Sequence, residues 1–117
     1  MVIDLDFDLF TVDLPDVDLT RRAVHAMSDT MASGRVGRLL PRLFRAAGLS
    51  EVTCNALFVP FSFGFVTHLI GGSLATAVEA GTLTQSEAEA FRESIETAEQ
   101  AGGLFAGVPF FVVSGTR

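Results

Sequence analysis

The hydrophobic and polar positions of this chain alternate between two periods, which predicts a mixed α/β domain. Apolar residues and aspartates alternate over residues 2–12, as in a strand that runs into an acidic loop. Two further apolar runs, at residues 52–59 and 104–114, predict two more strands. The run at 52–59 is apolar on both faces near its end, so we expect burial on both sides. Pro109 places the last strand at an edge or at a bulge.

Helical periodicity separates the predicted strands. Apolar residues recur at three- and four-residue steps in four segments, at residues 19–32, 37–48, 62–80 and 84–101. Asp18 precedes the first of these helices, and Pro41 is expected in the first turn of the second. The fourth opens with a capping box, in which Thr84 and Glu87 satisfy each other's backbone N–H groups. The predicted order is strand, two helices, strand, two helices, strand, forming one domain over residues 1–117.

The charge balance disfavours two classes of partner. The 117 residues carry 8 Lys and Arg against 14 Asp and Glu, a formal net charge of -6. Binding to nucleic acid or to an anionic membrane surface needs a basic surplus, so neither is expected. Residues 56–74 hold no charged side chain and approach the length of a membrane span, but Pro60 and three glycines interrupt them. We therefore expect a soluble protein whose 49% apolar content favours a partner.

The cysteine content indicates a reducing compartment. Cys54 is the only cysteine, so neither an intrachain disulfide nor a thiolate metal cluster can form. Its position in a predicted strand favours a small buried apolar side chain over a nucleophile. The residues after Met1 lack the basic and apolar regions of a secretory signal. These features favour the cytoplasm.

Few residues suggest chemistry. The glycine pairs at 34 and 37 and at 102 and 103 lack the preceding strand and following helix of a phosphate-binding loop, and are expected to be caps and turns. Neither His25 nor His68 has the partners of a metal face, so no metal is expected. Asp4, Asp6 and Asp8 follow a strand, where open α/β sheets bind ligands. A solvated acidic loop is the alternative interpretation of the three aspartates.

Several segments resemble one enzyme family. The strongest is GRLLPRLFRAAGL at residues 37–49, preceded by LTRR at 19–22 and by the acidic DLDF at 4–7. Together with residues 84–101 and the closing FFVVSG at 110–115, they resemble the C-terminal half of class I S-adenosylmethionine-dependent methyltransferases. The closer likeness is to small-molecule enzymes of the ubiquinone/menaquinone-biosynthesis type.

In that family the acidic loop often contains Glu-Pro-Asp-Trp. Asp6 matches the aspartate of this motif, whereas Asp4, Leu5 and Phe7 depart from it.

The resemblance implies a fold and a division of labour. The three predicted strands correspond to the fifth, sixth and seventh of the family's sheet, with the last inserted antiparallel. The fold class expected is therefore α/β, a partial Rossmann-like methyltransferase sheet of about three strands with four helices. The family's cofactor loop and acidic residue belong to its first two strands, which have no counterpart here. We expect the substrate-side half alone, a short or truncated reading frame that binds no cofactor and methylates nothing by itself.

The resemblance also suggests where an acceptor would bind. No catalytic residue is assigned, and the expected substrate is a hydrophobic small molecule. The candidate substrate-binding residues are Asp6, Phe7, Phe10, Arg35, Phe65 and His68. Asp6 or His68 would orient or deprotonate a substrate hydroxyl.

Two other functions are open. The chain could be a non-catalytic homodimeric interaction module, or a small-molecule binding protein that lost the methyl-donor site. A homodimer is expected because a sheet cut before its fifth strand leaves an unpaired edge at Val2 and Ile3. Leu39 and Leu40 add apolar surface that a second copy could cover.

Overall fold

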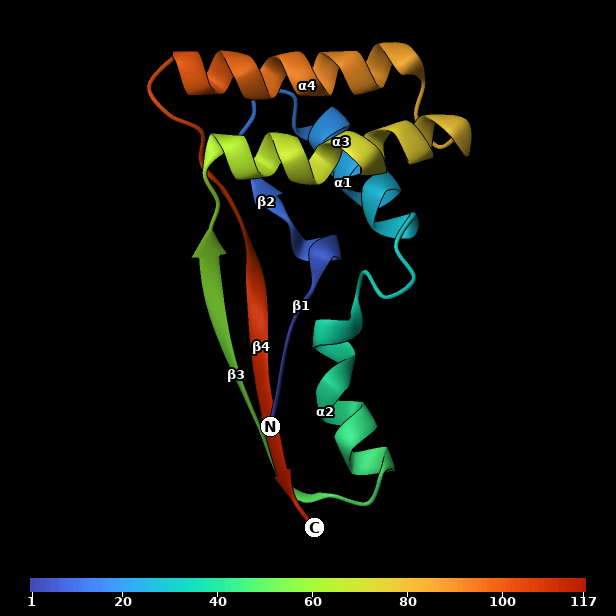
Figure 1. Ribbon diagram of the computed structural model, residues 1–117, viewed down its shortest axis with the longest axis vertical. Helices are drawn as coiled ribbons and strands as arrows, with labels where there is room; N and C mark the ends of the chain where they lie inside the picture. Colours follow the sequence, from blue (N-terminus) through green and yellow to red (C-terminus); the bar gives the residue numbers. More distant parts are fainter.

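The computed structural model describes residues 1–117 as an elongated α/β domain with four helices and a four-stranded antiparallel sheet (Figure 1). The strands are β1 (Val2–Leu5), β2 (Thr11–Val12), β3 (Ser50–Pro60) and β4 (Ala106–Thr116). The helices are α1 (Val17–Asp29), α2 (Val36–Ala46), α3 (Phe63–Glu79) and α4 (Gln85–Gln100), with a 3₁₀ turn at Phe7–Leu9. The mixed α/β class matches the prediction. The sheet has one strand more than the three predicted, because the acidic loop returns to pair briefly as β2.

The last strand is the centre of the sheet. β1 and β2 pair with one edge of β4 and β3 pairs with the other, all antiparallel. Val113 lies opposite Val2 on one side and Cys54 on the other. The predicted antiparallel orientation of the last strand is therefore confirmed.

The edge or bulge position predicted for Pro109 is wrong, because β4 is the central strand. The carbonyl oxygen of Pro109 accepts a hydrogen bond from the N–H of Asp6 at 3.2 Å, on the side of β1 and β2. Its backbone nitrogen faces the same side, where β1 has ended and β2 has not begun. A central strand tolerates the proline here because no ladder partner needs its missing N–H group.

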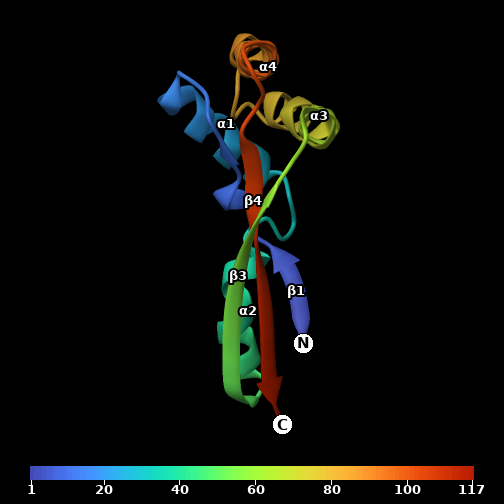
Figure 2. The same cartoon turned by 90° about the vertical axis from the view of Figure 1, so that its left-hand side faces the viewer.

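The burial predicted for β3 is also wrong. Most of its residues are exposed on both faces, including Leu57 at 60% and Phe58 at 46%. Cys54, expected to be buried, is exposed as well. β3 pairs only with β4, α2 lies along part of one face of the sheet, and the helical cluster lies beyond the end of β3 (Figures 1 and 2). Apolar sequence alone cannot bury a strand when a single helix, α2, covers only part of one of its faces.

The core lies at the helical end of the molecule. Helices α1, α3 and α4 gather there around the acidic loop and the adjoining end of β4, and eighteen buried apolar residues form one cluster (Figure 1). Its largest fully buried members include Phe91, Met27 and Ile70. α2 lies apart, alongside the lower part of the sheet (Figure 2). No helix has the length and apolar character needed to cross a membrane.

The helix ends show which local predictions hold. α4 begins with the predicted capping box, and α2 is followed two residues after its end by Gly48, whose φ of 88° is the left-handed conformation of a helix stop. α1 begins two residues earlier than predicted, because the side chain of Asp16, not Asp18, accepts the N–H of Leu19. Pro41 lies in the interior of α2 rather than in its first turn.

Candidate functional site

The acidic loop after β1 is tied to α2 by a buried ion pair. The side chain of Asp6 is 0% exposed, and Nη2 of Arg38 donates to its Oδ1 at 3.0 Å while Nε donates to Oδ2. Nη2 also reaches Asp8 at 3.3 Å. The pKa of Arg38 is raised above its ordinary value, and the largest cause is the hydrogen bond to Asp6. The two hydrogen bonds pair the guanidinium of Arg38 with the carboxylate of Asp6. They neutralise the negative charge of Asp6, which burial would otherwise disfavour.

This geometry gives Asp6 a structural task. Both of its oxygens are engaged by Arg38, and none of its side-chain surface reaches solvent. Arg38 therefore fixes this loop to α2. A basic residue in the first turn of α2 was the available sequence signal, but its partner lies 32 positions away.

Two glycines bring α2 close to this loop. The carbonyl oxygen of Gly34 accepts the N–H groups of Phe7 at 2.7 Å and Asp8 at 3.3 Å. A Cβ atom at position 34 would lie 2.6 Å from the hydroxyl of Ser28, and one at position 37 would lie 2.9 Å from the carbonyl oxygen of Leu5. Gly34 and Gly37, which we expected to serve as caps and turns, therefore mark two close contacts.

All three predicted phenylalanines, Phe7, Phe10 and Phe65, lie along one chain of aromatic contacts. Phe7 stacks on Phe10 with ring centroids 5.3 Å apart, and Phe10 lies 6.4 Å from Phe61. Phe61 in turn stacks on Phe65 at 4.6 Å. Phe7 and Phe10 are buried, whereas Phe65 is 44% exposed at the far end. Phe61, which the sequence did not single out, joins the loop to α3.

The remaining predicted site residues lie elsewhere. His68 is exposed on α3 and lines no cavity. Arg35 precedes the first residue of α2 and lines a cavity of about 500 Å³ with Ser28 and Leu43, here called the α2 hollow. The six predicted residues therefore do not surround one common pocket.

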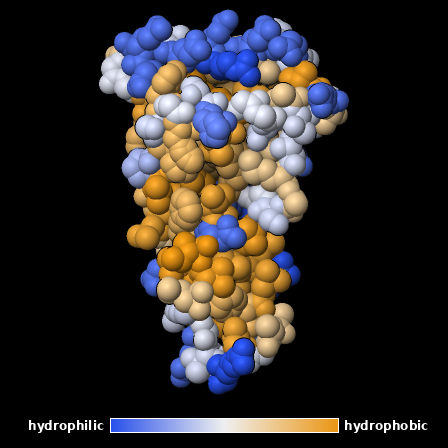
Figure 3. All heavy atoms as spheres, in the orientation of Figure 1, coloured by the Kyte–Doolittle hydropathy of each residue, from blue (hydrophilic) through white to orange (hydrophobic).

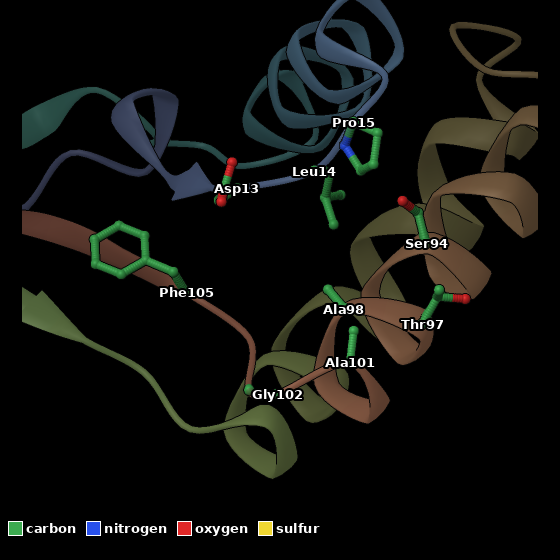
Figure 4. A pocket seen from close by; sticks show the side chains of 10 residues that line it. Asp13, Leu14, Pro15, Ser94, Thr97, Ala98, Ala101, Gly102 and Phe105 are labelled. Atoms are coloured by element: carbon green, nitrogen blue, oxygen red, sulfur yellow. The ribbon is translucent and has the colours of Figure 1, made fainter.

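Two further cavities lie on either side of the loop at Asp13 and Leu14. The first, the α4 hollow, measures about 580 Å³. Figure 4 shows Asp13, Leu14 and Pro15 on one wall and Ser94, Thr97 and Ala98 of α4 on the other. Asp13 is its only titratable group.

The second cavity, the α1 groove, has the richer chemistry. It measures about 440 Å³, and Phe10, Val12, Leu14 and Val24 are its buried apolar residues. Arg21 and His25 belong to α1, while Asp8 and Asp13 come from the loop. An apolar surface with a few polar groups is the usual composition of a small-molecule site.

The sequence contained a signal for this groove. Arg21 and His25 are four residues apart on a predicted helix and so share one face. The sequence prediction addressed whether His25 binds a metal and did not include its pairing with Arg21. No group of three or more His, Cys, Asp or Glu side chains is arranged to hold a metal ion.

No protein-family model matches the sequence, and no curated protein shows significant similarity to it.

Proposed function

We propose that this chain is the substrate-binding half of a methyltransferase-like protein of the S-adenosylmethionine-dependent, small-molecule type, and that it does not methylate by itself. The strand order carries the proposal. β4 comes last in the sequence but lies between β1 and β3, antiparallel to both. The sequence resemblance leads to the same expectation, that of a last strand inserted antiparallel into a Rossmann-like sheet.

The free edge of β1 fits this proposal. β1 pairs only with β4, and its other edge has no strand beside it. Val2 and Ile3 remain 39% and 58% exposed on this strand. A cofactor-binding half would extend the sheet along this edge and cover these side chains. The cofactor and catalytic geometry would then come from that half.

The α1 groove is the acceptor site that we favour. Phe10 is the predicted site residue that lines it, and its buried apolar residues suit a hydrophobic ring or chain. His25 and Arg21 on α1 would orient a hydroxyl or carbonyl oxygen on that molecule. The ion pair of Asp6 and Arg38 would act indirectly. It would hold in place the loop that forms the wall of the α1 groove opposite α1.

A titration with 4-alkylphenols, followed by amide NMR shifts, tests the acceptor site. We expect the largest shifts at Phe10, Thr20 and His25. His25→Ala should weaken binding at least threefold, whereas replacing His68, which is also exposed but lies on α3, with alanine should not change it. Weakening by His68→Ala alone would move the site to α3, and an absence of shifts would overturn the acceptor site.

A second candidate function is a cytoplasmic homodimeric interaction module. The exposure of β3 on both faces favours it, because apolar strands in stable monomers are normally covered. The net charge of -6 favours a protein partner over nucleic acid. Light scattering at micromolar concentration tests this candidate, and we expect twice the mass of one chain.

A further inference from the structure

We propose that the outer edge of β3 is a docking strand for a second copy of this chain, pairing antiparallel about Ala56. This inference deepens the homodimer named above by assigning the surface and the register. β3 has a partner on one edge only, and nothing lies beside its other edge (Figures 1 and 2). Figure 3 shows apolar residues gathered over the middle of the molecule and the part below it, between the polar helical end and a polar lower tip.

The pairing of β3 with β4 determines which backbone N–H and C=O groups of β3 have no strand partner. Phe61 donates its N–H to Ala106 of β4 at 2.8 Å, and pairing continues from Pro60 to Thr53 without a shift. Backbone direction alternates along a strand, so the odd-numbered residues of this stretch face β4. The N–H and C=O groups of Cys54, Ala56 and Phe58 therefore point to the free edge.

At both ends of β3, the backbone prevents further strand pairing along the free edge. Pro60 has no N–H to donate at the free edge. At the other end the register shifts between Ser50 and Thr53, where Glu51 has a φ of 52°. The regular segment between the two stops is 53–59, whose midpoint is Ala56. Antiparallel pairing of two copies about this midpoint uses every free backbone group of the segment and makes about six hydrogen bonds.

The side chains and charges agree with that register. Segment 53–59 contains no charged residue, so two copies of a chain with net charge -6 can meet there without repulsion. Cys54 would lie opposite Phe58 of the second copy, a favourable sulfur–aromatic contact. The two Glu51 side chains would be about 30 Å apart, well beyond the screening length in physiological salt.

The dimensions of the isolated chain also indicate that part of its surface is covered by a partner. Its radius of gyration is 16.1 Å, compared with about 13 Å for a compact domain of this length. Its accessible surface is 6794 Å², roughly 600 Å² more than its mass predicts. A stable interface buries about 800 Å² per partner, so one interface of ordinary size accounts for the excess.

Crosslinking tests the register. In a Cys54→Ser background, Ala56→Cys places two sulfurs opposite each other at a Cα separation of about 5.5 Å, which suits a disulfide. Thr53→Cys in the same background is the matched control, because its two copies would be about 20 Å apart. We expect oxidation to crosslink most of the first variant and less than a tenth of the second. Equal crosslinking of the two would overturn the register.

Charge substitution tests the surface. Ala56→Lys places two like charges opposite each other and should weaken dimerisation at least tenfold, while an unchanged amide NMR spectrum outside β3 verifies folding. Mixing Ala56→Lys with Ala56→Asp should restore the dimer. A monomeric parent chain at 100 µM would overturn the proposal, as would a dimer that Ile3→Lys separates and Ala56→Lys does not. Phenol binding is measured separately, so failure here leaves the acceptor site standing.

Discussion

Gly37 of α2 lies against the backbone of Leu5, so closely that a Cβ atom at position 37 would be 2.9 Å from the Leu5 carbonyl oxygen. The same atom would lie 2.7 Å from the ring of Phe111. Only a residue without a side chain lets α2 approach β1 and β4 at this distance. The contact holds α2 where Arg38, the next residue, reaches Asp6.

Gly37→Ala is therefore expected to destabilise the fold by about 1–3 kcal/mol, since the neighbouring atoms are backbone and a packed ring. The measurement is the midpoint of urea denaturation. Gly72→Ala in α3 is the control, because a Cβ there meets nothing within 4 Å. It should be neutral or stabilise by up to about 1 kcal/mol. Equal midpoints for the two variants would contradict the close contact.

Arg38→Met should cost about 3 kcal/mol of stability, because it leaves the carboxylate of Asp6 buried without its partner. Replacing both residues, Asp6→Leu with Arg38→Met, should recover a large part of that loss. A double-mutant cycle from urea denaturation measures the coupling energy between the two positions. Additive effects would show that the two side chains act independently.

Thr84→Ala removes the side-chain oxygen that accepts the N–H of Glu87 at 3.1 Å. We expect a loss of about 1 kcal/mol and no change in ligand binding, since α4 begins away from the α1 groove. Thr84→Ser, which keeps the hydroxyl, should lie close to the parent chain. A denaturation midpoint unchanged by the alanine would mean that this cap contributes nothing to α4.

The stability contributed by Glu87 should depend on pH. Its pKa is lowered from 4.5, first by the backbone N–H of Thr84 and then by the side chain of Arg22. A lowered folded-state pKa means that this contribution is present above pH 4.5 and is lost as the pH falls through the folded value. Comparing the parent chain with Glu87→Gln should therefore show a larger difference in stability at pH 7 than at pH 3.

S-Adenosylmethionine should not bind the isolated chain. The sequence lacks a strand, glycine loop and helix in the order that holds a dinucleotide-like cofactor. Isothermal titration calorimetry at 25 °C should show only heats of dilution. A micromolar dissociation constant would require a cofactor site among the residues described here and would contradict the proposed division of labour.

Local sequence determined most of the secondary structure of this protein. The capping box of Thr84 and Glu87 and the helix stop at Gly48 depend on hydrogen bonds between residues a few positions apart, so a short window contains the whole cause. The period-two and helical patterns likewise place strands and helices near their observed positions.

Only the tertiary structure decided which segments those helices and strands contact. The exposure of β3 depends on which layers cover it, and the tolerance of Pro109 depends on a gap between β1 and β2. The pairing of Asp6 with Arg38 joins residues 32 positions apart. Burial, strand neighbours and ion pairs are set by packing between distant segments, which periodicity within a short stretch of sequence does not encode.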